Sequence, residues 1–112
     1  MRTEADLEFF KEMLDIYVKE IPKNLNFIRN AIFQNNPDHL RFYVHKIKGS
    51  ALTLGIENVL GNLRILEDMA LENQINEETL KEFKKTSEQF DMILEEIALL
   101  KNKYSNISLE LD

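Results

Sequence analysis

Residues 35–55 read NNPDHLRFYVHKIKGSALTLG, and this stretch contains both the beginning and the end of one helix. Asn36, Pro37 and Asp38 predict the beginning, because Asn caps free N–H groups, proline fits the first helical position and a carboxylate favours the positive end of the helix dipole. Gly55 predicts the end, because glycine adopts the left-handed conformation without a Cβ clash. The residues that fall on the core stripe of this helix are Leu40, Val44, Ile47, Ala51 and Leu54.

Upstream of this stretch, apolar residues recur every three or four positions, which is typical of amphipathic helices. One such stripe covers residues 7–21 and another covers residues 25–32. Pro22 lies between them, and proline lacks an N–H and disfavours helix in the residue before it. We therefore expect the chain to bend near Glu20 and to form two helices here.

Downstream, the apolar stripe over residues 56–70 predicts a fourth helix, and Asn76 is expected to cap a fifth helix that continues to Tyr104. Short loops make consecutive helices antiparallel neighbours. The sequence thus predicts an all-α fold, an up-and-down antiparallel four-helix bundle with an additional N-terminal helix. We expect residues 1–104 to form this single domain and residues 105–112 to be a frayed tail.

The composition limits the domain count and the kinds of partner. A chain of 112 residues makes one domain, and 44% apolar residues suffice for one core. Its 14 basic and 20 acidic residues give a net charge of −6, which repels nucleic acid and anionic membrane surfaces. The acidic N-terminus and the absence of a long apolar run indicate neither a signal peptide nor a membrane span. We therefore expect a cytoplasmic protein that binds neither nucleic acid nor membranes.

His45 is the candidate for chemistry on the central helix. At about 100° per residue it lies roughly 140° from the centre of the core stripe, so it points to solvent. A solvent-facing imidazole is largely neutral at pH 7, and its Nε2 lone pair can act as a nucleophile. Lys48 can place positive charge near a phosphoryl oxygen, and Gly49 leaves room for an approaching partner. Each residue also has an ordinary explanation, namely a surface histidine, a lysine stem over the core edge and a tolerated glycine.

Two large apolar residues, Phe42 and Leu52, flank His45, and Arg41 lies one turn before it. Charged residues are more typical of an outer helix face. The three residues are candidates for partner contacts. Burial of Phe42 and Leu52 against a neighbouring helix would explain them equally well.

Residues 45–55, HKIKGSALTLG, resemble the signature of histidine-containing phosphotransfer (HPt) domains of bacterial-type multistep phosphorelays. That signature is His, any residue, an aliphatic, Lys, Gly, two small residues, then an aliphatic and Gly. Every position is filled, Leu66-Glu67 also resembles the family's usual sequence, and the resemblance covers nearly the whole chain.

The resemblance implies a phosphoryl carrier in two-component signal transduction. Such a carrier accepts and donates phosphate on a surface histidine, here His45, to and from aspartates of response-regulator receiver domains. Lys48 would aid the transfer electrostatically and Gly49 would give steric access. The partners would be a receiver domain, a sensor histidine kinase, or both, and the receiver would supply Mg²⁺. The carrier would hold no cofactor of its own and would not be a self-sufficient catalyst.

Two other functions are compatible with the sequence. The chain could be the phosphorylation domain of a chemotaxis-type histidine kinase, whose signature is similar, or a non-catalytic helical interaction module. We expect no kinase domain, because 112 residues are too few for an ATP-dependent kinase, and Lys48-Gly49-Ser50 lies within a helix and is not a phosphate loop. It shows no metal-binding motif, and His39 falls on a different helix face as a solvated surface residue. A monomer is expected, because its exposed apolar cluster is assigned to a transient partner.

Overall fold

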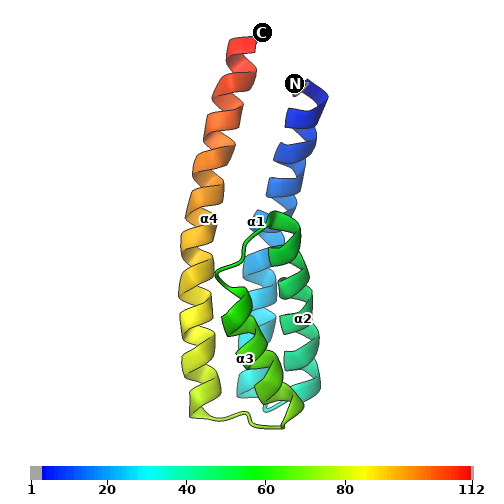
Figure 1. Cartoon of the computed structure of the whole chain (residues 1–112), viewed down its shortest axis with the longest axis vertical. Coiled ribbons are helices and arrows are strands. Elements are labelled where there is room, and N and C mark those ends of the chain that lie inside the picture. Colours follow the sequence, from blue (N-terminus) through cyan, green and yellow to red (C-terminus); the bar gives the residue numbers. More distant parts are fainter. Residues whose placement is uncertain (1–3, 112) are drawn as a thin grey trace.

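The computed structural model describes the backbone of residues 4–111 and the side chains of residues 4–103. The elements are α1 (Glu4–Phe33), α2 (Pro37–Leu54), α3 (Leu60–Leu71) and α4 (Glu77–Leu111). The chain passes down α1, returns along α2, passes down α3 and returns along α4 (Figure 1). Each helix contacts the next one, and α4 closes the ring against α1. The prediction of an all-α helical bundle is confirmed.

The predicted break in the first helical segment is wrong, because α1 continues through Pro22. Among the described residues there is accordingly no additional N-terminal helix, and the residues expected to form it make up the first half of α1. Proline inside a helix costs about 3 kcal/mol, because one backbone hydrogen bond is lost and the ring clashes with the carbonyl four residues before it. Here Ile21 and Leu25 are both buried on one stripe, so a continuous helix keeps both in the core. Pro22 itself is exposed, so water can reach the carbonyl of Val18 that its ring leaves without a donor.

All four helices contribute to one hydrophobic core. On α2 the predicted stripe is buried: Leu40, Val44, Ile47 and Ala51 are fully shielded, and Leu54 packs against them from the edge. Phe90 of α4 is the largest fully buried side chain among the described residues. This burial fixes the rotation of α2 about its axis and so determines which side chains face outward.

Both ends of α2 are capped as predicted. The side chain of Asn36 accepts a hydrogen bond from the backbone N–H of His39 at 3.1 Å. At the other end Gly55 is left-handed, with φ 72°, and the N–H of Ile56 donates to the carbonyl of Ala51 at 2.8 Å. This is the Schellman arrangement, which satisfies the last carbonyls of a helix. These hydrogen bonds fix the residues at which α2 begins and ends.

The remaining turns follow similar rules. Asn35 and Asn73 are left-handed after α1 and α3, a conformation that Asn tolerates better than most residues. Asn76 accepts from the N–H of Thr79, which confirms it as the cap of α4. α3 begins at Leu60, later than the apolar stripe predicts, because Ile56 and Val59 pack on the core from the turn before it.

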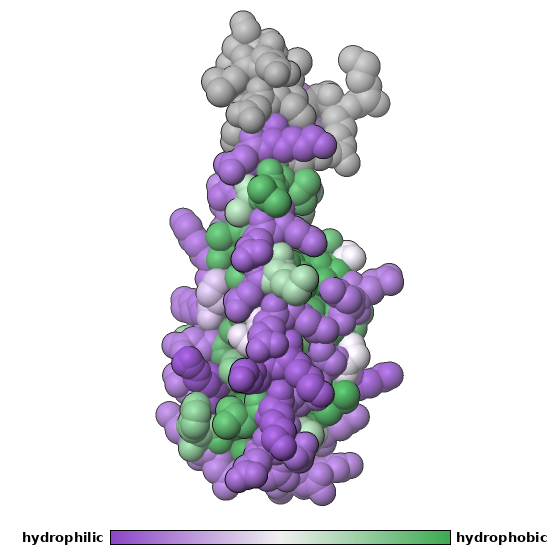
Figure 2. Space-filling model, turned by 90° about the vertical axis from the view of Figure 1, so that its left-hand side faces the viewer, coloured by the Kyte–Doolittle hydropathy of each residue, from purple (hydrophilic) through white to green (hydrophobic). Residues whose placement is uncertain are grey.

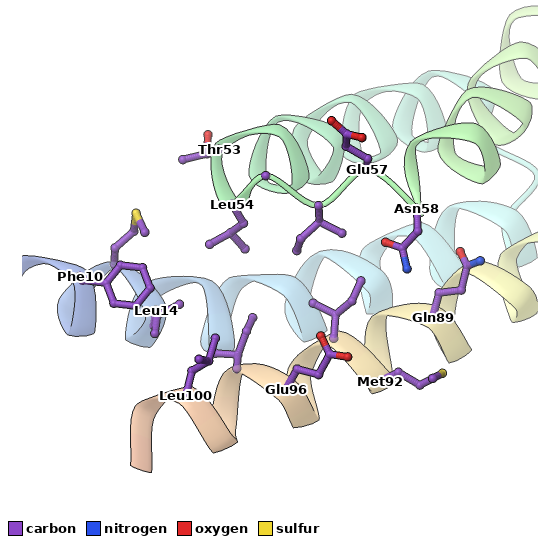
Figure 3. Close-up of a pocket in the computed structure, with 15 residues that line it drawn as sticks. Phe10, Leu14, Thr53, Leu54, Glu57, Asn58, Gln89, Met92, Glu96 and Leu100 are labelled. Carbon is purple, nitrogen blue, oxygen red and sulfur yellow. The ribbon is translucent and has the colours of Figure 1, made fainter. Parts of the chain in front are cut away.

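The helices α1 and α4 continue beyond the turn that joins α2 and α3 (Figure 1). A mainly apolar hollow of about 630 Å³ lies where they emerge (Figure 3). Phe10 and Leu14 of α1, Leu54 of α2, and Met92 and Leu100 of α4 are among its lining residues. It lies at the C-terminal end of α2 and does not include His45.

The side of the molecule formed by α4 is mainly hydrophilic where the structure describes it (Figure 2). Lys84, Glu88 and Glu95 are among its exposed residues. Of the helices in the described part of the chain, none has the length and apolarity needed to cross a membrane. The backbone of α4 continues to Leu111, past the end expected at Tyr104. Side chains from residue 104 onward lie outside the described residues, and the frayed tail expected at 105–112 stays a prediction.

Candidate functional site

The outer face of α2 carries the residues that the sequence singles out. Val44 and Ile47 are both fully buried, so His45 is turned away from the core and is exposed, as the helical spacing predicts. No hydrogen bond or ion pair reaches its ring from any side chain that the structure describes. The imidazole is therefore accessible and its nitrogens are available for a partner.

An open hollow of about 600 Å³ lies beside His45, between α2 and α3. The residues that line it together with His45 are Asp38, Arg41, Phe42, Lys46 and Glu67. Two are cationic, two are anionic and one is aromatic. The hollow can therefore hold a charged group bound to the imidazole, and solvent can enter it freely.

Lys48 does not line this hollow but pairs with the neighbouring helix. Its Nζ lies 3.6 Å from Oε2 of Glu67 on α3, and the two side chains are 32% and 22% exposed, respectively. That carboxylate oxygen is buried and accepts no hydrogen bond within the described chain. The ion pair links the signature lysine to α3. The sequence placed Lys48 beside the incoming phosphoryl group and did not reveal this partner.

Gly49 lies one turn beyond His45 on the exposed face. A Cβ atom added there would meet nothing within 4 Å, and the backbone is ordinary helix. Its carbonyl accepts a hydrogen bond from the Thr53 hydroxyl at 2.9 Å, which any residue at this position would allow. The described chain therefore offers no internal reason for a glycine here, and the space beside it is open to an approaching molecule.

Phe42 and Leu52 are 60% and 59% exposed, so burial against a neighbouring helix does not explain them. The Phe42 ring meets Tyr43 edge-on at 5.0 Å, and Tyr43 in turn stacks on Phe27 of α1 at 4.7 Å. These contacts hold one side of Phe42 and leave the other side free. Arg41 is also exposed. The face around His45 thus combines exposed apolar and cationic side chains.

The second histidine does not join this site. His39 is exposed near the start of α2, and its ring meets Tyr43 edge-on at 6.4 Å. Within the described part of the chain, no group of three or more His, Cys, Asp or Glu side chains is arranged to hold a metal ion. The histidine with an open space beside it is His45.

Sequence reasoning did not assign a role to Glu67. It lies 22 positions after His45, and only the packing of α3 on α2 brings it to the same hollow. The one signal available in the sequence was its place in the pair Leu66-Glu67. Leu66 is fully buried, so the residue after it falls at the edge of the α2–α3 contact.

Comparison with known proteins gives one family. A family model described as Hpt domain matches residues 12–103. No curated protein and no solved structure gives a significant match. The matched range contains all of α2 and α3, and with them the whole surface described above.

Proposed function

The chain belongs to the Hpt domain family, and on this premise we propose that it carries a phosphoryl group on His45. Membership of this family implies that the chain takes part in phosphotransfer in phosphorelay signalling. The position of His45 supports its role as the phosphorylated residue. Its imidazole is exposed beside an open hollow, on a helix whose inner face is fully buried. Such a helix holds the nucleophile in a fixed place, which is the main contribution a carrier can make.

The proposed step transfers a phosphoryl group from an aspartyl phosphate. The Nε2 lone pair of His45 forms the N–P bond while the P–O bond of the donor breaks. The donor aspartate leaves as a carboxylate, and Nδ1 keeps its proton, so the imidazole ring becomes positively charged. The reverse step delivers the group to an aspartate of a second receiver. This chain has no means of making phosphohistidine from ATP by itself.

Lys48 and Gly49 would assist from the next turn of α2. Lys48 is held by Glu67 at 3.6 Å, and in the proposed step it exchanges this carboxylate for a phosphoryl oxygen when the receiver docks. The open space beside Gly49 would admit the edge of a receiver that must bring phosphorus to Nε2. Both roles depend on a bound partner.

Hpt domains interact with receiver domains and kinases. We assign Arg41, Phe42 and Leu52 as contacts for such a partner, because all three are exposed on the face of His45. Mg²⁺ would come with the receiver and would neutralise charge on the transferring phosphoryl group. A monomeric state and a cytoplasmic location stay predictions from the sequence.

The test is phosphoryl acceptance from a Mg²⁺-loaded, phosphorylated receiver domain, read by intact mass and by acid lability. We expect the wild type and a His39→Ala control to gain one phosphoryl group, and His45→Ala to gain none while folding normally. Label on His45→Ala would mean that another residue is the acceptor.

A second donor separates the alternatives. If several receivers give no label but a histidine-kinase catalytic domain with ATP does, the chain is the phosphorylation domain of a kinase. If neither donor labels it and a partner still binds His45→Gln, the chain is a non-catalytic module.

A further inference from the structure

We propose that Arg41 binds the phosphoryl group once His45 carries it, so that the guanidinium, and not only Lys48, sets the affinity of the carrier for phosphate. This inference rests on the proposed function. Arg41 lies one turn before His45, and both line the same hollow. Helical side chains lean toward the N-terminus of their helix, so the imidazole leans over the turn that carries Arg41. Residues four positions apart are neighbours on a helix surface, about 5–6 Å between their Cβ atoms.

The other two cations on this face are less well placed. Lys48 is paired with Glu67 and does not line the hollow. Lys46 lines the hollow but follows His45 directly, so it projects about 100° away around the helix. Arg41 takes part in no ion pair or hydrogen bond of its side chain within the described part of the chain. Two cations line the hollow, Arg41 and Lys46, and neither is paired within the described residues; Arg41 is the one that lies on the same side of the helix as His45.

A guanidinium also suits this ligand chemically. Its planar fork can donate two parallel N–H···O hydrogen bonds to phosphoryl oxygens, whereas an ammonium acts as a point charge. Two carboxylates face the same space. Glu67 is balanced by Lys48, but Asp38 is not balanced by any ion pair within the described residues. Asp38 lies three positions before Arg41 and should compete with the phosphoryl group for it.

The first measurement is the equilibrium between phosphorylated receiver and phosphorylated carrier. Arg41→Ala should shift it toward the receiver by about threefold to tenfold, and Arg41→Lys should shift it less, because the bidentate contact is lost but the charge remains. Asp38→Asn should shift it the opposite way. Arg64→Ala is the matched control, because Arg64 is an exposed α3 residue that does not line the hollow. It should leave the equilibrium unchanged.

The second measurement removes the protein partner. Phosphoramidate can place a phosphoryl group on histidine without a receiver, and a ³¹P NMR titration of that species reports its immediate charges. Loss of Arg41 should raise the pKa of the phosphoryl group, because a nearby positive charge favours its dianion. Arg64→Ala should leave the titration unchanged.

The outcomes distinguish this inference from the proposed function. If wild-type His45 accepts no phosphate from any donor, the proposed function fails and this inference fails with it. If His45 is labelled but Arg41→Ala matches Arg64→Ala in both measurements, this inference alone is wrong. If only the receiver equilibrium changes and the titration does not, Arg41 contacts the partner and does not bind the phosphoryl group.

Discussion

Replacing Gly49 by glutamine should stabilise the chain and at the same time slow phosphoryl transfer. Glycine in a helix interior is about 1 kcal/mol less favourable than alanine, and glutamine is close to alanine in helix propensity. Because an added Cβ would meet nothing within 4 Å, no clash in the described chain offsets this gain. We therefore expect the free energy of unfolding to rise by about 0.7–1 kcal/mol, which for a domain of this size is roughly 4 °C in Tm.

The effect on transfer should depend on the size of the new side chain. Alanine adds one methyl group and should give a small decrease, whereas glutamine extends over the space through which a receiver approaches Nε2 of His45. The assay pairs urea unfolding followed by circular dichroism with the initial rate of transfer from a phosphorylated receiver. Gly61→Ala is a matched control, because Gly61 is also helical and exposed with nothing within 4 Å, but lies on α3.

Two results would refute this reasoning. A loss of stability in Gly49→Ala would mean that the chain itself needs the glycine. An unchanged transfer rate in Gly49→Gln, with Gly61→Ala also unchanged, would mean that the open space serves no approaching partner.

Three further substitutions test the fold and the surface. Pro22→Ala should raise the free energy of unfolding by about 1–3 kcal/mol, because it restores a hydrogen bond to the carbonyl of Val18 at an exposed position of a continuous helix. A lower free energy of unfolding in urea would contradict the continuous course of α1 through Pro22. Phe42→Ala and Leu52→Ala should change stability by less than about 1 kcal/mol, because both side chains are mostly exposed, but should raise the receiver concentration needed for half-maximal transfer. Transfer that saturates as in the wild type would remove these two residues from the docking surface.

The helix α2 could be predicted closely because its signals are local. Asn36 and Gly55 act on backbone groups within one turn of themselves, and the buried stripe between them places His45 outward by geometry alone. Pro22 shows the limit of local reasoning. Its cost is local, but the burial of Ile21 and Leu25 that overcomes it depends on helices far away in the sequence.

The same limit explains what the sequence did not reveal at the site. Glu67 reaches Lys48 only because α3 packs on α2, and no helical spacing within one segment contains that contact. The sequence likewise did not decide whether Phe42 is buried or exposed, because a position at the margin of the core stripe is compatible with either. Packing between helices decided both questions.

The described ends of the first and last helices, Glu4 and Leu111, lie at the same end of the molecule, and this limits how a tethered receiver could reach His45 (Figure 1). At 1.5 Å per residue, α1 is about 45 Å long. His45 lies about 12 Å from the end of the molecule at which α2 begins, so about 33 Å separate it from the end that holds Glu4 and Leu111. A flexible Gly/Ser linker attains that root-mean-square length only at about 36 residues. A linker shorter than about 10 residues cannot span this distance even when it is fully extended. A receiver fused through such a linker would therefore serve the histidine of another molecule, and its transfer rate would depend on protein concentration.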